Sequence, residues 1–161
     1  MSLNINIGKA LPEDWEPAME LAWRTFLKFE APDYGKEGTE NFLKFISGEE
    51  LYKMFLIGEY KVYVAKENDT IVGVATLRSG HHISLLFVDE AFHKKGIGKG
   101  LLSALQQDIS EEYNSLIMTV NAAPYAIDFY KKLGFFETDS LKAADGICFL
   151  PMQIFTKIND D

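Results

Sequence analysis

The first third of the chain predicts one strand followed by helices. Apolar residues alternate with polar ones over residues 3–7, a spacing typical of a strand. A helical spacing follows, for which Asp14 is the candidate N-cap. Segment 31–35 breaks this spacing, and two shorter helices are expected near residues 42–48 and 49–55. The apolar face of the first helix consists of Trp15, Met19, Ala22, Trp23 and Phe26.

The middle of the chain changes to the alternation expected of strands. The pattern predicts strands near residues 62–65, 71–78 and 81–88. Turns are expected at Asn68-Asp69 and at Gly80, residue types that favour reversals of the chain. These three strands therefore predict an antiparallel meander.

The second half predicts two helices with strands between and after them. A stripe at helical spacing consists of Ile97, Leu101, Leu102, Leu105 and Ile109. A β-rich run at 116–120 follows and is expected to lie parallel to the strand before the helix, because a long crossover joins them. Pro124 and Gly134 delimit the second helix, and the last strands are expected at 135–136 and 147–158. The face of this helix consists of Ala126, Phe129, Tyr130 and Leu133.

Together these elements predict one α+β domain over residues 1–161, with a mixed sheet of six to seven strands flanked by about four helices. The net charge of −8 argues against a nucleic-acid binder and is compatible with a cationic substrate. No apolar run is long enough to span a membrane, and no metal site is indicated. The single cysteine, Cys148, lies in an apolar run, which predicts a buried structural thiol and a cytoplasmic protein.

Three glycines, Gly96, Gly98 and Gly100, lie at the start of the helix that follows strand 81–88. Glycine there lowers helix stability, so close approach of a ligand to the backbone is a good reason for it. A helix start offers free N–H groups and a positive dipole end, and Lys94, Lys95 and Lys99 add charge. The loop therefore predicts a pyrophosphate site. The alternative is that the glycines only allow close packing of the helix on the sheet.

Two other phosphate motifs fit less well. In the dinucleotide fingerprint the glycines follow the strand directly, but here Gly96 comes eight positions after Val88 and Gly100 one position too early. The nucleotide P-loop needs Gly-Lys followed by Ser or Thr, which this loop lacks. An oxidoreductase that binds NAD(H) stays a third-ranked hypothesis.

The loop His93-Lys94-Lys95-Gly96-Ile97-Gly98 resembles the Gln/Arg-x-x-Gly-x-Gly/Ala signature of the GNAT superfamily of N-acetyltransferases. The segment Asn121–Phe135, which ends in Phe-Tyr-Lys-Lys-Leu-Gly-Phe, resembles the second signature of that family. The order of predicted elements also matches over nearly the whole chain. Two positions depart from the pattern: His93 replaces Gln or Arg, and Ala123 stands where many members have Asn.

The resemblance implies that acetyl-CoA is the acetyl donor and that the reaction is direct attack by a primary amine in a ternary complex. The main chain of the third meander strand would then hold the pantetheine arm, with Asn121 as a further contact or, alternatively, a helix cap. The loop would hold the pyrophosphate. The implied donor-binding residues are Phe87, Val88, His93, Lys94, Lys95, Gly96, Ile97, Gly98, Lys99, Gly100, Asn121 and Tyr130.

The resemblance also places Tyr130 where the family has the tyrosine that protonates the leaving thiolate; the alternative is a core aromatic. His82 stands where some members have a glutamate base, and His81 should point to the opposite face. Asp89, Glu90 or solvent are alternative bases.

The acceptor is expected to be a small-molecule or peptide amine, held among the aromatic residues of the early helices. The alternative is a non-catalytic acyl-CoA-binding or sensing module on the same fold. A homodimer through a sheet edge or an apolar helix is a further option. The residues expected to frame the acceptor are Trp23, Phe26, Phe29 and Tyr34.

Overall fold

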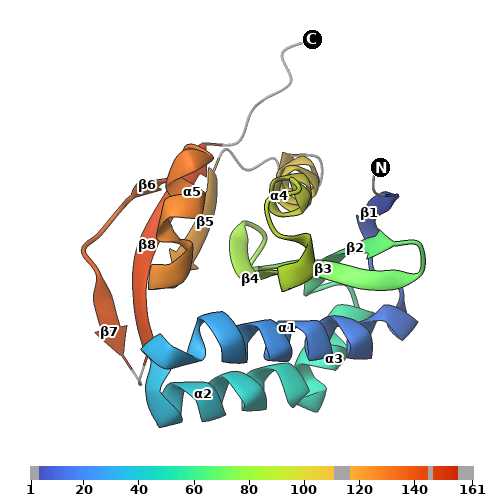
Figure 1. The fold of residues 1–161 in the computed structure, drawn as a ribbon, viewed down its shortest axis with the longest axis horizontal. Helices are drawn as coiled ribbons and strands as arrows, with labels where there is room; N and C mark the ends of the chain where they lie inside the picture. Colours follow the sequence, from blue (N-terminus) through green and yellow to red (C-terminus); the bar gives the residue numbers. More distant parts are fainter. Residues whose placement is uncertain (1–3, 111–116, 145–146, 156–161) are drawn as a thin grey trace.

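A computed structural model describes residues 4–110, 117–144 and 147–155. It contains an eight-stranded mixed sheet in the order β1-β2-β3-β4-β5-β8-β6, with β7 paired to β8 (Figure 1). The strands are β1 Ile5–Lys9, β2 Lys61–Glu67, β3 Thr70–Arg78, β4 His82–Val88, β5 Ile117–Ala122, β6 Phe136–Glu137, β7 Lys142–Ala144 and β8 Ile147–Phe155. The helices are α1 Trp15–Phe29, α2 Ala31–Ser47, α3 Glu49–Leu56, α4 Ile97–Asp108 and α5 Ile127–Lys132. Short 3₁₀ turns cover Pro12–Asp14, Glu90–Phe92 and Pro124–Ala126.

The predicted α+β fold with a mixed sheet is confirmed, and so is the antiparallel meander β2-β3-β4. The strand expected at 135–136 is β6, which is two residues long at Phe136–Glu137. Among the described residues β7 is an additional strand that was not expected, because three residues are too short to produce an alternation in the sequence. Residues 3, 116 and 156–158, which were assigned to strands, lie outside the described part of the chain.

Each face of the sheet has its own hydrophobic core. Helices α4 and α5 cover one face and helices α1, α2 and α3 the other (Figure 1). All five residues of the predicted α4 stripe are buried, as expected for the core-facing side of an amphipathic helix. Within the described residues, no helix is both long and apolar enough to span a bilayer.

Two details at the ends of helices differ from the prediction. Asp14 precedes α1 but makes no capping bond; its carboxylate accepts a hydrogen bond from the Leu11 N–H at 2.8 Å and pairs with Lys66. The expected break at 31–35 is confined to Gly35, which has a φ of 66° inside α2. Helix α2 thus begins at Ala31, one residue after the C-cap of α1, and bends at its glycine.

Strands β4 and β5 are parallel, as predicted, but they pair over only two positions. His82 lies opposite Thr119 and Ile83 opposite Val120, and beyond Ile83 the two strands pair no further. Next to this point Ser84 is an extra residue in β4, because Thr76 of β3 pairs with Leu85 and Leu77 pairs with Ile83. Such a bulge bends the strand and changes which side chains point to each face. The two halves of the sheet therefore separate here.

Cys148 was predicted to be buried, but it is only half-buried and carries a free thiol. It lies in β8 near the edge of the sheet, opposite Ala143 of β7. The apolar run that surrounds it does not mark a core strand, because the partner strand β7 is short and exposed at Lys142 and Ala143.

Candidate functional site

A cavity of about 330 Å³ opens where β4 and β5 separate. We call it the β4–β5 cavity. Its walls come from both strands, from the α1–α2 junction and α2, from the end of β3, and from α5 and β8. The lining residues that bear on chemistry are Glu30, Tyr34, Arg78, His82, Asn121 and Tyr130.

His82 lies at the start of β4 and lines this cavity. Its Nδ1 is 2.8 Å from the Thr119 hydroxyl oxygen on the neighbouring strand. Burial, helped by the positive charges of Arg78 and His81, lowers the pKa of His82 to about 4. The imidazole is therefore neutral at pH 7. His81, expected on the opposite face, lies in the turn before β4 and does not line the cavity.

Tyr130 lines the same cavity from α5 and is 4% exposed. Its ring packs edge-on against Phe129 and Phe135, at centroid distances of 5.2 and 5.1 Å. Burial raises the pKa of this phenol well above its ordinary value, and the charge of Glu30 raises it further. Tyr130 thus has both an anchored core ring and a position on the cavity wall. The two alternative readings of this residue are compatible.

The predicted donor-binding residues of β4 and β5 lie around the separation of these strands. Phe87 and Asn121 line the cavity, and the Asn121 side chain is exposed. The Val88 carbonyl accepts a hydrogen bond from Nε2 of His93 at 2.7 Å. Because a carbonyl only accepts, Nε2 carries the proton. The His93 side chain therefore points back to the end of β4, and its hydrogen bond holds the loop between β4 and α4 in place.

The start of α4 has the features of an anion site. Its N-cap is Gly96, with a φ of 80° and no side chain that caps the helix. The first N–H groups of a helix have no partners within it, so those of Ile97 and Gly98 face outward. A Cβ at Gly96 would meet no atom within 4 Å, so the space beside it is open. Lys94, Lys95 and Lys99 are all exposed around it.

The sequence suggested that all three glycines allow a ligand to approach the backbone. The structure gives another reason why Gly98 and Gly100 are glycines. A Cβ at Gly98 would lie 3.0 Å from the Phe129 ring of α5, and one at Gly100 would lie 2.7 Å from Cδ1 of Ile7. Both glycines therefore allow close packing on the helix and strand beside α4. Only Gly96, with its left-handed backbone, retains the open space that a ligand needs.

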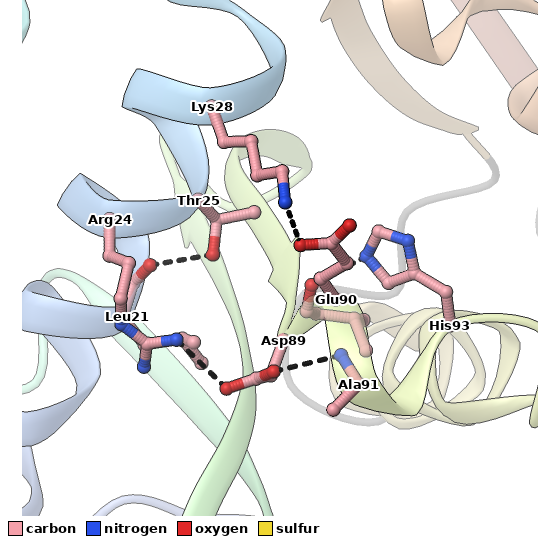
Figure 2. A network of polar contacts seen from close by, with 9 residues as sticks. Leu21, Arg24, Thr25, Lys28, Asp89, Glu90, Ala91 and His93 are labelled. Atoms are coloured by element: carbon pink, nitrogen blue, oxygen red, sulfur yellow. Dashed lines mark hydrogen bonds and ion pairs between the residues drawn. The ribbon is translucent and has the colours of Figure 1, made fainter.

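Asp89 and Glu90, the alternative bases, are both occupied by ion pairs with α1. Asp89 accepts from Arg24 at 2.9 Å and from the Ala91 N–H at 3.0 Å, while Glu90 pairs with Lys28. Figure 2 shows these two cations of α1 reaching across to the loop that precedes α4. The hydrogen bond from Arg24 holds the pKa of Asp89 below its usual value. These carboxylates fasten α1 to the loop.

Arg24→Gln is expected to lower the free energy of unfolding at pH 7 by about 0.5 kcal/mol, a small effect because the pair is half exposed. Because the pKa of Asp89 is lowered, the ion pair stabilises the fold at pH values above that pKa. The stabilisation is lost when the pH falls and the carboxylate becomes protonated. Urea unfolding at pH 7 and pH 3 measures both effects, with Lys36→Gln as an exposed control on α2. An equal deficit at both pH values would contradict the ion-pair explanation.

The aromatic residues expected to frame the acceptor are distributed over different places. Only Tyr34 lines the β4–β5 cavity. Phe26 is fully buried in the core behind it, and Trp23 lines a separate groove beside α1. Phe29 stacks between His93 and Tyr125, at centroid distances of 5.3 and 4.8 Å. Helical spacing does not explain this, because Trp23, Phe26 and Phe29 are three residues apart on α1; on this side of the molecule the lining begins only at Glu30, where α1 ends.

The sequence analysis missed Glu30, which joins α1 to α2 and lines the cavity. Burial raises the pKa of Glu30 to about 7, opposed by a hydrogen bond with Tyr34 and helped by Asp33. The available signal was its spacing of four residues from both Phe26 and Tyr34. Within the described residues, no three His, Cys, Asp or Glu side chains gather as they would around a metal ion.

Comparison with known proteins agrees with this geometry. A GCN5-related N-acetyltransferase from Rhodopseudomonas palustris superposes with a TM-score of 0.78 at 24% identity, over 95% of this chain and 97% of that one. The PaiA N-acetyltransferase from Thermoplasma acidophilum, solved in complex with coenzyme A, gives 0.75 at 23% identity, over 95% and 98%. An aminoglycoside 6'-N-acetyltransferase from Enterococcus faecium gives 0.67 at 15%, over 97% and 99%. At these identities the likeness shows the fold.

A search of curated protein sequences gave no match. A family model, described as the acetyltransferase (GNAT) domain, matches residues 30–155, which is most of the chain. With the separated strands, the uncapped glycine start of α4 and the tyrosine on α5 in their expected order, this match shows that the chain belongs to the GNAT acetyltransferase family.

Proposed function

We propose that this protein moves the acetyl group of acetyl-CoA to a primary amine by direct attack in a ternary complex. The observation that carries the proposal is the separation of β4 from β5 beside the uncapped start of α4. It leaves an unpaired strand edge at the cavity, and the start of α4 with its free N–H groups lies near Val88, at the end of that strand. Neighbours solved with coenzyme A, among them the Thermoplasma acidophilum PaiA enzyme, support the choice of donor.

The residues present fit such a donor. Beyond Ile83 the edge of β4 does not pair with β5, and Phe87 and Val88 lie along this stretch, where the amides of the pantetheine arm would meet the main chain; the Val88 carbonyl, which accepts from His93, has a second lone pair for such a contact. Asn121 on β5 faces the same opening. The N–H groups at the start of α4 and the nearby lysines suit the pyrophosphate. We assign His93 to holding the loop through the Val88 carbonyl, in place of direct phosphate contact.

When bound, acetyl-CoA supplies a thioester whose sulfur leaves as a thiolate. We propose that Tyr130 donates a proton to this sulfur, since its raised pKa keeps the phenol protonated at neutral pH. For the base we propose His82, which acts through water as a neutral imidazole. Its low pKa means that it passes a proton on at neutral pH and does not retain it.

The amine acceptor is the open part of this proposal. Small-molecule acceptors are supported by the aminoglycoside acetyltransferases among the structural neighbours, and a peptide amino group would fit the same chemistry. The single free cysteine supports a cytoplasmic location for the activity. We make no choice between a monomer and a homodimer.

Release of free thiol from acetyl-CoA, measured with a panel of amines, aminoglycosides and peptides, tests the function directly. Turnover with an amine supports the transferase. Tight binding of acetyl-CoA without turnover on any acceptor would favour the non-catalytic binding module. Binding of NAD(H) without acetyl-CoA, seen by fluorescence titration, would instead support the oxidoreductase hypothesis.

Gly96→Val is expected to weaken acetyl-CoA binding about 10-fold or more, because a β-branched residue rarely adopts a φ of 80° and shifts the loop. Calorimetric titration measures the affinity. Gly58→Val is a matched control, since Gly58 has a φ of 85° and equally open surroundings at the end of α3. Equal affinities in the two variants would contradict the proposed pyrophosphate site.

A further inference from the structure

Glu30 occupies a junction that the proposed mechanism does not use. It is the C-cap of α1 and the residue before α2, and its N–H donates to the Phe26 carbonyl at 2.9 Å. Its carbonyl accepts from Asp33 at 2.9 Å, so the backbone on both sides is fixed. From this fixed point the side chain lines the β4–β5 cavity together with His82 and Tyr130.

The cavity gives this carboxylate unusual surroundings. Within the described residues that line it, Glu30 is the sole carboxylate, and Arg78 and His82 are the other ionisable groups besides two tyrosines. The Tyr34 hydroxyl hydrogen bonds to Glu30, which fixes the side chain. The other charged neighbour is Asp33, and the half-buried Cys148 lies near Tyr34. A single carboxylate in a half-apolar cavity is suited to binding one cation.

Glu30 also acts on both ends of the expected reaction. After burial, its charge is the next cause of the raised pKa values of Tyr130, the proposed acid, and of the exposed Tyr125. Both side chains line the same cavity, so an amine bound there for attack beside Tyr130 shares the cavity with the Glu30 carboxylate.

We propose that Glu30 binds the ammonium group of the acceptor and takes its proton, and that the acceptor is an aliphatic primary amine, which is protonated in solution. This inference rests on the proposed acetyl transfer and adds the substrate class and a catalytic residue to it. An amine that is already neutral in solution would not need Glu30.

The proton and the bonds balance as follows. One N–H bond of the ammonium breaks and its proton goes to the Glu30 carboxylate, which leaves a neutral amine. The amine nitrogen forms a bond to the acetyl carbonyl carbon, and the carbon–sulfur bond breaks. The sulfur takes a proton from Tyr130, and the second proton of the amine nitrogen returns to the Tyr130 oxygen through water. Glu30 releases its proton to solvent when the product amide leaves.

The two candidate bases differ in their affinity for a proton. Because the pKa of Glu30 is about 7 and that of His82 is about 4, a proton on the imidazole moves downhill to the carboxylate. His82 then keeps its proposed part in proton transfer through water as a relay, and Glu30 is the group that finally holds the proton. Glu30 is the group that is ionised and ready at pH 8, and this readiness falls as the pH drops below about 7.

Glu30→Gln tests the proposal with two amines of the same shape, ethylamine and trifluoroethylamine, at saturating acetyl-CoA. Fluorine keeps the second amine neutral at pH 8. We expect kcat/KM to fall about 100-fold for ethylamine and at most about threefold for the neutral amine. Glu20→Gln is the matched control, an exposed carboxylate on the same helix that does not line the cavity.

Two further readouts separate a proton acceptor from a structural residue. With ethylamine the wild-type kcat/KM should show an inflection near pH 7, which Glu30→Gln removes. Because folding raises the pKa of Glu30 from 4.5 to about 7, the folded state loses stability relative to the unfolded chain between these two pH values, and the loss is complete above pH 7. Glu30→Gln should therefore raise Tm by roughly 5 °C at pH 8 and leave it unchanged at pH 4.

Each remaining outcome has one reading. If wild type acetylates amines and Glu30→Gln keeps its ethylamine activity, or loses both amines equally, the role of Glu30 is overturned while the transferase stands. If wild type acetylates no amine although it binds acetyl-CoA, the proposed function itself fails. An inflection near pH 7 that persists in Glu30→Gln also overturns the inference.

Discussion

Tyr130→Phe is expected to lower kcat for acetyl transfer about 100-fold or more, with the affinity for acetyl-CoA unchanged within about twofold. The substitution removes one hydroxyl from a ring that Phe129 and Phe135 hold in place, so the cavity wall keeps its shape. What the substitution removes is the proposed proton donor to the leaving sulfur. Thiol release measures the rate and calorimetry the affinity.

The matched control is Tyr125→Phe, which removes a hydroxyl from a tyrosine that is 51% exposed and does not line the cavity. It should keep nearly the wild-type rate. Because the pKa of Tyr130 is raised above its usual value near 10, the phenol also stays protonated through alkaline pH, and no loss of rate from its ionisation is expected up to about pH 10. A near-wild-type rate for Tyr130→Phe would remove the tyrosine from the mechanism.

Phe26→Ala is expected to lower the free energy of unfolding by about 3 to 5 kcal/mol. The Phe26 ring is fully buried, with Phe42 stacked on it at 4.0 Å and Tyr34 edge-on at 4.9 Å. Truncation leaves a cavity that these rings cannot fill without moving. Since Phe42 and Tyr34 both line the β4–β5 cavity, the KM for the amine should also rise. Urea unfolding and steady-state kinetics measure the two effects.

Leu27→Ala gives the comparison, because Leu27 is the next residue of the same helix and is 44% exposed. Its effect on the free energy of unfolding should stay below about 1 kcal/mol. Equal destabilisation by the two substitutions would mean that helix propensity dominates, and Phe26 would then not be the support of the cavity wall.

The sequence predicted best the elements whose periodicity is long and strong. The α4 stripe and the meander β2-β3-β4 follow from spacing alone, since one buried face requires apolar residues at every turn or at alternate positions. The parallel pairing of β4 with β5 followed from the crossover between them. These features are local in the chain, so the sequence contains their whole signal.

The rest depends on contacts between residues that are distant in the chain. Gly98 is small because Phe129 packs on it, and Gly100 because Ile7 does, facts that no local pattern contains. Asp14 pairs with Lys66 of β2 and so does not act as a capping group. Glu30 looked like an ordinary exposed glutamate at the end of a helix until the fold placed it in the cavity.

The two-position pairing of β4 with β5 has a consequence for how the whole molecule holds together. One half of the sheet consists of strands β1–β4 and the other of strands β5–β8. Within the described strands, only the short pairing of β4 with β5 joins the two halves through main-chain hydrogen bonds. A ligand whose amide groups lie along the unpaired edge of β4 can form the hydrogen bonds that a neighbouring strand would otherwise form. If the donor binds along β4 as proposed, we expect its binding also to join the two halves of the sheet before the amine arrives.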